Sequence, residues 1–392
     1  MKQKRAYKYR FYPTDEQASI LARTFGCCRY VYNWALRART DAYYQHGERL
    51  SYAGTAQRLT ALKKQADHAW LSEVSSVPLQ QSLRHLDRAF RNFYEGRADY
   101  PTFHKKRGEQ AATYAASAFT WDGTQLTLAK MTTPLAIHWS RPLPASCKPT
   151  TVTITQDTAD RYFVSILLEE EMKPLPLVTK QVGLDLGIKS MVVLSTGETV
   201  GNPKYFAKDE QKLARAQRRL AKKQKGSQNR AKARRKVARL HARIADRRRD
   251  YQHKLSTRII HENQVVCVES LQVKNMVKNH SLAKAISDVG WGEFVRQLEY
   301  KARWYGRTLV KIDTFYPSSK RCFECGHIVE SLALEIRHWA CPACGVAHDR
   351  DINAARNVLA AGQAVTACGE SVRPGAVKTK PGSPRRTRNL SE

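Results

Sequence analysis

Acidic residues stand at the ends of two apolar segments between residues 180 and 270 of this 392-residue chain. Asp185 follows Val182 and Leu184, which alternate with small or polar neighbours as on a strand, and Glu269 ends a second apolar strand-like run. A buried strand rarely carries a carboxylate for packing reasons. For Asp185 alone, a hydrogen bond to a nearby backbone amide explains the residue about as well as a functional role does.

A third acid changes that balance. Asp349 and Asp351 precede an alanine-rich helical pattern, in HDRDINAARNVLAAG. Asp349 best fits the helix cap, whereas Asp351 lies within the first turn and can project toward a sheet. Asp185, Glu269 and Asp351 therefore supply three carboxylates from three elements of one α/β domain, where strand ends form active sites.

Three carboxylates of this kind suit the hydrolysis of phosphodiester bonds. That reaction uses two Mg²⁺ ions roughly 3.5 to 4 Å apart, held by oxygen ligands. We expect Asp185 to bridge both ions, and Glu269 and Asp351 each to complete one coordination shell. No cysteine or histidine nucleophile is required.

Four cysteines have the spacing of a metal site. Cys322, Cys325, Cys341 and Cys344 form C-x2-C-x15-C-x2-C, which is typical of two zinc knuckles that share one structural Zn²⁺. A redox CxxC pair explains one half of the pattern but not the matched second half. A closed four-sulfur shell leaves no open position, so His348 is not needed as a ligand. The other five cysteines are scattered as small buried residues tend to be: Cys27, Cys28, Cys147, Cys267 and Cys368.

The chain is strongly basic. Its 67 Lys and Arg against 35 Asp and Glu give a formal charge of +32, so a polyanion is the natural partner. Nucleic acid is favoured over a membrane, because no apolar run of membrane-spanning length and no secretory signal occur. We expect a cytoplasmic protein without membrane contact.

The basic residues concentrate in one stretch. Residues 204–258 hold 21 Lys or Arg against 4 acids, on a pattern that predicts a long helical hairpin interrupted at Gly226. A solvated basic helix is the alternative interpretation, but like charges this dense favour contact with phosphates. Arg234, Arg235 and Lys236 are the candidate nucleic-acid ligands of this hairpin.

The N-terminal part predicts a β domain with a helical insertion. Residues 4–12 alternate as a strand, amphipathic helices follow to about residue 98, and short strands resume from residue 100. We expect the first strand to join the later ones in a small antiparallel barrel or sheet. Its helices are rich in aromatic residues, most of them expected in the core, although stacking on nucleic acid is the alternative: Tyr30, Tyr32, Trp34, Tyr43 and Tyr44. Further along, residues 287–306 predict one capped helix.

Several motifs in fixed order resemble those of the TnpB family, the transposon-encoded relatives of type V CRISPR effector nucleases. They include GLDLGIKS, VVCVESL, PSSKRCFECG, CPACG and HDRDINAARN, and upstream RFYPTDEQ and CCRYVYNWAL. The resemblance implies RNA-guided cleavage of double-stranded DNA beside a short target-adjacent motif, by a monomer that carries a guide RNA derived from the transposon end. It also implies that Asp185, Glu269 and Asp351 are the metal-binding triad, and that Tyr52 and Gln80 contact the target-adjacent duplex.

The expected fold class is a multidomain α+β and α/β protein. The resemblance implies a wedge-like β-barrel (1–13 and 99–176) with a helical recognition insertion (14–98). A RuvC-type, ribonuclease H-like nuclease domain (177–317 and 346–365) follows, with the basic hairpin at 204–262. Residues 318–345 are expected to form a zinc-ribbon target-loading module, and 366–392 a basic disordered tail. Two other functions remain as alternatives: a guide-dependent DNA-binding regulator that does not cleave, and a strand-transferring transposase.

Overall fold

The computed structural model describes residues 2–144, 148–333, 335–367 and 377–378. By their internal contacts, these residues form two compact units. We call Lys2–Glu171 with Lys223–Arg239 the N-terminal unit, and Met172–Lys222 with Leu240–Glu392 the C-terminal unit. Among the described helices, none has the length and apolar character needed to cross a membrane.

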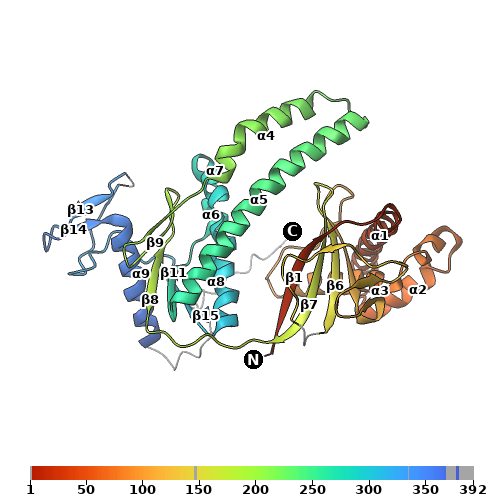
Figure 1. The fold of residues 1–392 in the computed structure, drawn as a ribbon, viewed down its shortest axis with the longest axis horizontal. Helices are drawn as coiled ribbons and strands as arrows, with labels where there is room; N and C mark the ends of the chain where they lie inside the picture. Colours follow the sequence, from red (N-terminus) through yellow and green to blue (C-terminus); the bar gives the residue numbers. More distant parts are fainter. Residues whose placement is uncertain (1, 145–147, 334, 368–376, 379–392) are drawn as a thin grey trace. The chain divides into compact units, whose positions relative to one another are not determined.

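One antiparallel sheet forms the base of the N-terminal unit (Figure 1). Its strand order is β2 (Gln110–Ala115), β6 (Pro149–Gln156), β7 (Tyr162–Glu171), β1 (Lys2–Phe11) and β5 (Ile137–His138). Strand β1 pairs along its whole length with β7, which confirms that the first strand joins the later ones. The pairings between the described strands form a sheet with β2 and β5 at the ends of the strand order, which is one of the two forms, barrel or sheet, that the sequence predicted.

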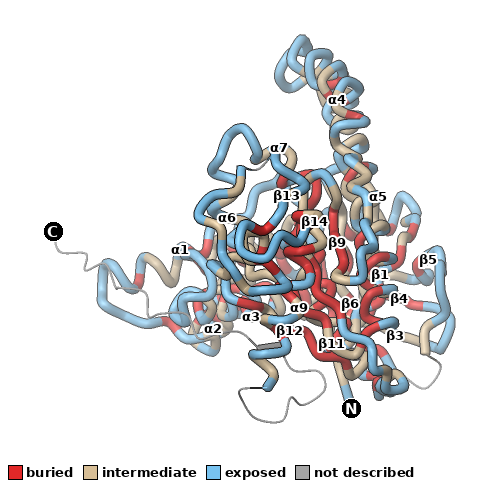
Figure 2. Tube along the Cα trace, turned by 90° about the vertical axis from the view of Figure 1, so that its left-hand side faces the viewer, coloured by how far each residue is buried: buried red, intermediate tan, exposed pale blue. Residues whose placement is uncertain are grey.

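Helices cover this sheet. They are α1 (Asp15–His46), α2 (Tyr52–Leu62) and α3 (Ser76–Tyr94), with a short 3-10 helix at Ala66–Ser72 and a hairpin of β3 (Phe119–Trp121) and β4 (Leu126–Leu128). Helix α1 begins with a capping box, in which Thr14 Oγ1 accepts from the Gln17 amide and the Gln17 side chain accepts from the Thr14 amide. The apolar faces of helices and sheet share one core, and the buried segments concentrate in the strands (Figure 2).

A mixed sheet forms the centre of the C-terminal unit. Its order is β10 (Thr199–Gly201), β9 (Ser190–Leu194), β8 (Gln181–Asp185), β11 (Val265–Glu269), β12 (Thr308–Ile312) and β15 (Val377–Lys378). Strand β9 is antiparallel to both of its neighbours, β10 and β8, whereas β8, β11, β12 and β15 are parallel to one another. The carboxyl ends of β8 and β11 therefore lie at the same edge.

The helices of this part of the chain are α4 (Tyr205–Ala221), α5 (Gln228–Glu262), α6 (Val273–Met276), α7 (His280–Val289), α8 (Trp291–Tyr305) and α9 (Arg350–Ala367). Helices α4 and α5 form the predicted hairpin. The capped helix predicted over 287–306 is confirmed as α8, but it begins at Trp291, because Gly290, at φ 71°, ends α7 and caps α8. Residues without a β-carbon adopt this left-handed conformation readily, whereas helical periodicity does not report it.

Helix α9 lies unusually close to the sheet. A β-carbon on Gly183 of β8 would overlap the carbonyl oxygen of Ala355 and lie 2.6 Å from the amide nitrogen of Leu359. A β-carbon on Gly362 would lie 2.8 Å from the Cys267 β-carbon on β11. Both glycines thus permit a close approach that larger residues prevent, and this approach fixes α9 against β8 and β11.

Two predictions concern the cysteines and the tail. Cys27, Cys28 and Cys267 are buried as expected, whereas Cys147 and Cys368 lie outside the described residues. Most of the predicted disordered tail, 366–392, also lies outside them. Within its described part the prediction is wrong, because α9 extends to Ala367 and Val377–Lys378 pairs with β12.

Candidate active site and cysteine cluster

Asp185 and Glu269 end neighbouring parallel strands. Leu184 of β8 is paired with Val268 of β11, so the acids that follow them occupy the same level at the carboxyl edge of the sheet. Both side chains are partly exposed, although the residues before them are fully buried. The apolar strands thus anchor the two carboxylates and leave their oxygens within reach of a ligand.

Asp351 enters from the first turn of α9. The Asp349 carboxylate accepts hydrogen bonds from the amides of Asp351 (3.0 Å) and Ile352 (2.9 Å), which confirms that Asp349 caps the helix. Capping therefore leaves the Asp351 carboxylate for another role. The close packing of α9 on β8 brings this third acid to the strand ends.

The other two carboxylates contribute to the electrostatic environment of Asp185. The pKa of Asp185 is raised well above its usual value, first by burial and then by the negative charges of Glu269 and Asp351. Arg350 and Arg337 oppose that rise. Burial also raises the pKa of Glu269. A cluster of acids that repel one another in this way is stabilised by a cation.

Two of the acids are held by residues from the cysteine-containing segment. The hydroxyl of Ser318, a buried residue, donates to Glu269 Oε1. Arg337 Nη1 donates to both oxygens of Asp351, at 2.9 and 3.2 Å. The sequence did not predict Ser318 or Arg337 as partners of the acids. No spacing pattern links either residue to Glu269 or Asp351, and the PSSK and RHW segments do not indicate a contact with a carboxylate.

The donor set fits Mg²⁺. Its members are carboxylate oxygens, the ligands that this ion prefers. Because Asp185 carries a raised pKa that a nearby divalent cation would lower, the arrangement is chemically suited to such an ion.

The four cysteines form a compact cluster. The sulfur atoms of Cys322, Cys325, Cys341 and Cys344 all lie within 4.8 Å of one another, with Cys322 and Cys344 3.7 Å apart and Cys325 and Cys341 3.6 Å apart. A tetrahedron with Zn–S bonds of about 2.3 Å has edges of about 3.8 Å, so the geometry fits zinc. The His348 Nε2 atom lies 3.0 Å from Cys322 Sγ but is not part of this four-sulfur group.

The two halves of the cluster are built alike. In each CxxCG segment the glycine amide donates to the first cysteine's carbonyl, and the glycine has a positive φ: 78° at Gly326 and 75° at Gly345. Backbone amides and neighbouring thiols lower the pKa of Cys341 to about 7 against the opposing effect of burial. Strands β13 (His338–Ala340) and β14 (Ala347–Asp349) complete the segment.

Helix α9 anchors this segment. The buried Asn353 accepts from the Phe323 amide (3.0 Å) and donates to the Arg321 carbonyl (2.8 Å). The buried Asn357 donates to the carbonyls of Ser318 (2.9 Å) and Arg321 (2.6 Å). Helix α9 therefore carries Asp351 and also holds the backbone at the start of the first cysteine knuckle, through hydrogen bonds to Ser318, Arg321 and Phe323.

The candidate duplex-contacting residues lie on the helices of the N-terminal unit. Tyr52 begins α2, and Gln80 is exposed on α3. Arg84, one turn after Gln80, lies over the Tyr52 ring at 5.6 Å from its centroid and donates to its hydroxyl at 3.4 Å. Sequence reasoning missed Arg84, whose spacing from Gln80 on one helix face was the available signal.

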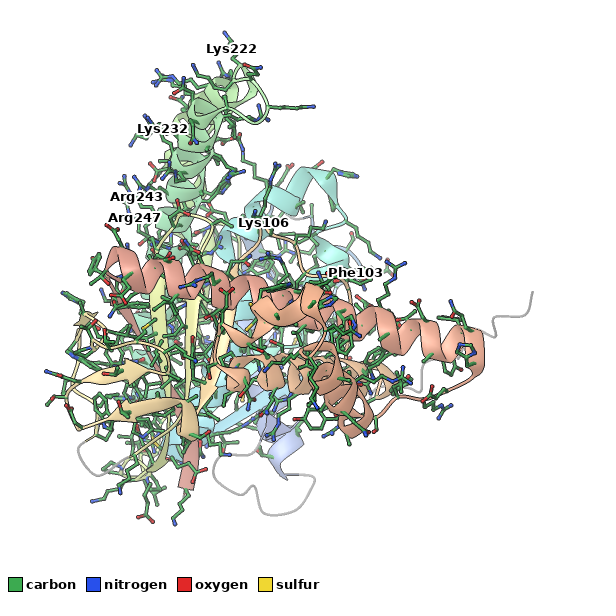
Figure 3. The ribbon with its side chains drawn as sticks, turned by 90° about the vertical axis from the view of Figure 1, so that its right-hand side faces the viewer. Phe103, Lys106, Lys222, Lys232, Arg243 and Arg247 are labelled. Atoms are coloured by element: carbon green, nitrogen blue, oxygen red, sulfur yellow. The ribbon has the colours of Figure 1, made fainter. Side chains whose placement is uncertain are left out.

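The hairpin carries cations along its length, as Figure 3 shows for Lys222, Lys232, Arg243 and Arg247. Arg234 and Lys236 are exposed, whereas Arg235 forms an ion pair with Asp160 at 3.6 Å. Two of the three predicted ligands thus face solvent.

The aromatic residues of α1 divide into two groups. Tyr32 is buried, and Tyr30 and Trp34 pack against the core, as predicted for most of them. Tyr43 and Tyr44 are exposed instead, and they line a pocket of about 570 Å³ together with Tyr94 and Tyr100.

Comparisons with known families place the chain among transposon proteins. A family model described as "Probable transposase" (OrfB_IS605) matches residues 163–280, and a "Cas12f1-like, TNB domain" model matches residues 291–358, which include the cysteine cluster. A "Helix-turn-helix domain" model matches residues 1–48, but the described residues there form strand β1 and the single helix α1.

Two relatives match nearly the whole chain. A protein of Streptomyces pristinaespiralis named "Putative RNA-guided DNA endonuclease" is 56% identical over 372 residues, 95% of this chain and 92% of the relative. InsQ of Escherichia coli K12 has the same description. It is 35% identical over 393 residues, which are 96% of this chain and 96% of InsQ.

A solved structure shares the fold. The protein in a Cas12f1–sgRNA–target DNA complex superposes with a TM-score of 0.56 at 14% identity, covering 88% of this chain and 83% of that one. This similarity concerns the mixed α/β fold, within which the TNB domain holds the four cysteines.

Proposed function

Because the chain belongs to the TnpB/OrfB_IS605 transposase family, we propose that it is an RNA-guided DNA endonuclease that depends on divalent metal ions. The observation that supports this proposal is that Asp185 and Glu269 end neighbouring parallel strands, and that the charges of Glu269 and Asp351, after burial, raise the pKa of Asp185. The names of the relatives and the charge of +32 support a nucleic-acid substrate.

In the proposed reaction the three acids hold Mg²⁺. Asp185 would be shared by two ions, and Glu269 and Asp351 would each complete the shell of one. Such ions would activate the attacking water and stabilise the leaving oxygen. Ser318 restrains one oxygen of Glu269 and leaves Oε2 for a ligand.

The domain roles are part of the proposal. The sheet at 177–317 and 346–365 acts as a RuvC-like nuclease domain of ribonuclease H-like fold, and residues 318–345 as a zinc-bearing target-loading module. Residues 1–13 and 99–176 act as the wedge, and 14–98 as the recognition insertion. The guide RNA, derived from the transposon end, and the double-stranded target are the partners of a monomeric protein.

The test uses purified protein, its copurifying guide RNA and a plasmid carrying a matched target beside candidate adjacent motifs. We expect linear product in Mg²⁺, and no product in EDTA. Asp185→Asn, Glu269→Gln and Asp351→Asn should each abolish cutting while RNA binding remains, because each retains side-chain volume and removes a charge. Full activity of any one variant excludes that residue from the site.

Two other functions have distinct signatures. A guide-dependent regulator would bind the matched plasmid without linear product in Mg²⁺. A transposase would join labelled transposon ends without guide RNA. The presence of all three acids, two at strand ends and one in the first turn of α9, favours the nuclease over the regulator.

A further inference from the structure

A short, strongly basic segment connects α3 to β2 in the N-terminal unit. We call its residues 103–108, FHKKRG, the basic loop. The Phe103 side chain is 56% exposed, and Lys105, Lys106 and Arg107 are exposed as well; Phe103 and Lys106 are labelled in Figure 3. None of these three cations forms an ion pair with a residue that the structure describes. One segment therefore offers an aromatic ring and three positive charges to a ligand.

Helix α1 holds the first half of the basic loop. The Asn33 side chain donates to the His104 carbonyl (3.0 Å) and accepts from the His104 amide (2.8 Å). The His104 ring also stacks on the Tyr32 ring, with the ring centroids 3.8 Å apart and the planes at 9°. These contacts fix the backbone next to Phe103.

Gln110, the first residue of β2, holds the second half. Its side-chain amide donates to three carbonyls of the loop and its Oε1 accepts from Arg29 Nη1 of α1 at 2.6 Å. The three carbonyls belong to Lys105, Lys106 and Gly108, at 3.4, 3.3 and 2.8 Å. Because the backbone is already ordered, binding costs less conformational entropy than it does for a free loop.

The basic loop forms one wall of a pocket of about 310 Å³. Phe103 lines this pocket together with Phe25 and Tyr32 of α1, so much of the wall is aromatic. Lys105 lines it as well, and Glu109 is the only acid among its described lining residues. The volume is at the lower end of pockets that hold small molecules, about 300 to 1,000 Å³. A flat ring with a phosphate beside it suits this place.

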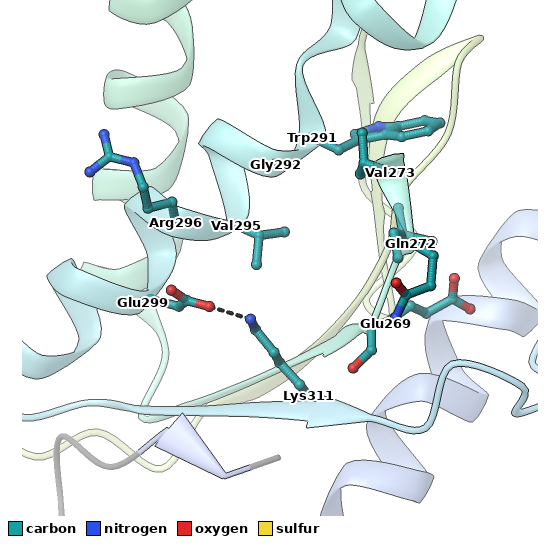
Figure 4. Close-up of a pocket in the computed structure, with 11 residues that line it drawn as sticks. Glu269, Gln272, Val273, Trp291, Gly292, Val295, Arg296, Glu299 and Lys311 are labelled. Atoms are coloured by element: carbon teal, nitrogen blue, oxygen red, sulfur yellow. Dashed lines mark ion pairs between the residues drawn. The ribbon is translucent and has the colours of Figure 1, made fainter. Parts of the chain in front are cut away.

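A pocket of about the same volume in the C-terminal unit has a different charge distribution (Figure 4). There Lys311 forms an ion pair with Glu299, drawn as a dashed line, and Arg296 forms one with Glu293. Both cations among the described lining residues of that pocket are thus paired. A phosphate would have to displace a carboxylate there, whereas the cations of the basic loop are available.

The pocket at the basic loop lies on a different side of α3 from the candidate duplex contacts. At about 100° for each helical residue, Arg84 lies about 40° around the helix from Gln80. Ser82 and His85 line the pocket, and they lie about 200° and about 140° from Gln80. A duplex that contacts Tyr52 and Gln80 would therefore leave the basic loop open to another strand.

We propose that the basic loop binds an unpaired nucleotide of the guide RNA. The Phe103 ring stacks on the base at the mouth of the pocket, and the three cations contact the neighbouring phosphates. The proposal rests on the proposed function, because it takes a guide RNA as the partner. Stacking on an aromatic side chain requires an exposed base face, which loops and ends of a folded RNA offer and paired bases inside a duplex do not.

The first experiment measures the Kd between the full-length protein and the RNA that copurifies with it, by filter binding without DNA. Phe103→Leu removes the ring but keeps apolar bulk, and it should raise the Kd about tenfold. Phe103→Tyr keeps the ring and should bind as wild type does. Since Phe103 is largely exposed, both variants should melt as wild type does.

Two results of this comparison overturn the proposal. One is an RNA Kd that Phe103→Leu leaves unchanged. The other is equal weakening in Phe103→Leu and Phe103→Tyr, which would mean that the ring does not stack. If Phe103→Leu keeps its RNA affinity but the loaded complex binds target DNA more weakly, the basic loop serves DNA instead.

The second experiment tests the phosphate contacts. Changing Lys105, Lys106 and Arg107 together to Gln should reduce the magnitude of the slope of log K against log[salt] by about 2.1, at about 0.7 for each contact with a single strand. The matched control exchanges the same residues for the other cation, as Lys105→Arg, Lys106→Arg and Arg107→Lys, and should keep the slope of wild type. A wild-type slope in the Gln variant overturns the phosphate contacts.

The third experiment locates the nucleotide with single abasic sites along the unpaired parts of the guide RNA. At one position, loss of the base should raise the Kd of wild type about tenfold and leave the Kd of Phe103→Leu unchanged, because both changes remove the same contact. Equal losses in both proteins, or no sensitive position, overturn the proposal.

These measurements are separate from cleavage. A wild-type complex that binds the RNA but cuts no matched DNA in Mg²⁺ refutes the nuclease function, and the RNA affinities still decide the basic loop. If no RNA copurifies with wild type, both proposals fail.

Discussion

Arg337 Nη1 donates to both carboxylate oxygens of Asp351, at 2.9 and 3.2 Å. Arg337 lies between the two cysteine knuckles, and Asp351 lies in the first turn of α9. A cation from the cysteine-containing segment thus contacts an acid that we propose as a metal ligand. The guanidinium and a metal ion compete for the same oxygens.

Removing this cation should change the metal requirement. We expect Arg337→Ala to reach half-maximal cleavage at a Mg²⁺ concentration roughly threefold lower, by loss of a competing charge. The ion pair is solvent-exposed, so the free energy of unfolding should fall by less than about 1 kcal/mol. Arg258→Ala is a matched control: Arg258 pairs with Glu198 at equal exposure, 41% against 42%. A higher Mg²⁺ requirement in Arg337→Ala would mean that Arg337 positions Asp351 instead.

At neutral pH and without metal, the wild-type protein should be less stable than a variant with an uncharged residue in place of Asp185. Its pKa is raised in the folded state by burial, Glu269 and Asp351, so the folded state holds this proton more tightly than the unfolded chain does. The resulting stability is present below about pH 4 and is lost as the pH rises through the raised pKa. In EDTA, Asp185→Asn should therefore melt at a higher temperature than wild type at pH 7.5, and at nearly the same temperature at pH 4.

The same comparison in Mg²⁺ should reverse the order, because only wild type gains stability from the ion. Asp250→Asn, at an exposed ion pair on α5, is the control and should show neither effect. A lower melting temperature of Asp185→Asn in EDTA at pH 7.5 would contradict the account of mutual repulsion.

The contact of α9 with the sheet depends on Gly183. Gly183→Ala places a β-carbon against backbone atoms of Ala355 and Leu359, which no side-chain rotation can relieve. We expect a loss of more than about 2 kcal/mol in the free energy of unfolding, by overpacking. Denaturant unfolding measures it, with Gly201→Ala as a control in open surroundings. Equal stability of the two variants would show that α9 can move away from β8.

Loss of one thiolate should release the zinc. Cys341→Ser is expected to reduce bound zinc, measured by mass spectrometry, and to lower the melting temperature. Because Asn353 and Asn357 join the first knuckle to α9, cleavage should fall as well. Cys27→Ala, in the core of the N-terminal unit, should keep its zinc. Unchanged zinc in Cys341→Ser would exclude the four-sulfur site.

Exposed cations of the hairpin should determine the salt dependence of RNA binding. Changing Arg234 and Lys236 to Gln removes two cations that face solvent. If both contact phosphates, the slope of log K against log[salt] should decrease in magnitude by about 1.4, at about 0.7 for each contact with a single strand. Filter binding at several salt concentrations measures it. The matched pair Lys2→Gln and Lys64→Gln, two exposed cations elsewhere in the chain, should leave the slope close to that of wild type.

Local patterns predicted much of the site. The strands before Asp185 and Glu269 follow from short apolar runs, the Asp349 cap from its place before a helix, and the cysteine cluster from spacing alone. Contacts made only after folding were not predictable: Ser318 and Arg337 reach the acids through the attachment of their segment to α9. The start of α8 was predicted about four residues too early, because periodicity does not report the left-handed conformation of Gly290. Alternation left open a barrel or a sheet, because it does not specify which strands pair.

The place of α9 in the chain has a consequence for synthesis. Asp351 is synthesised long after the strands that carry Asp185 and Glu269. Its helix can pack against those strands only because Gly183 and Gly362 leave room for the close contact. Ribosome-bound or prematurely terminated chains that end before α9 can complete much of the sheet, yet they lack the proposed third ligand. A cell would thus be exposed to cutting only by molecules whose translation has passed this point.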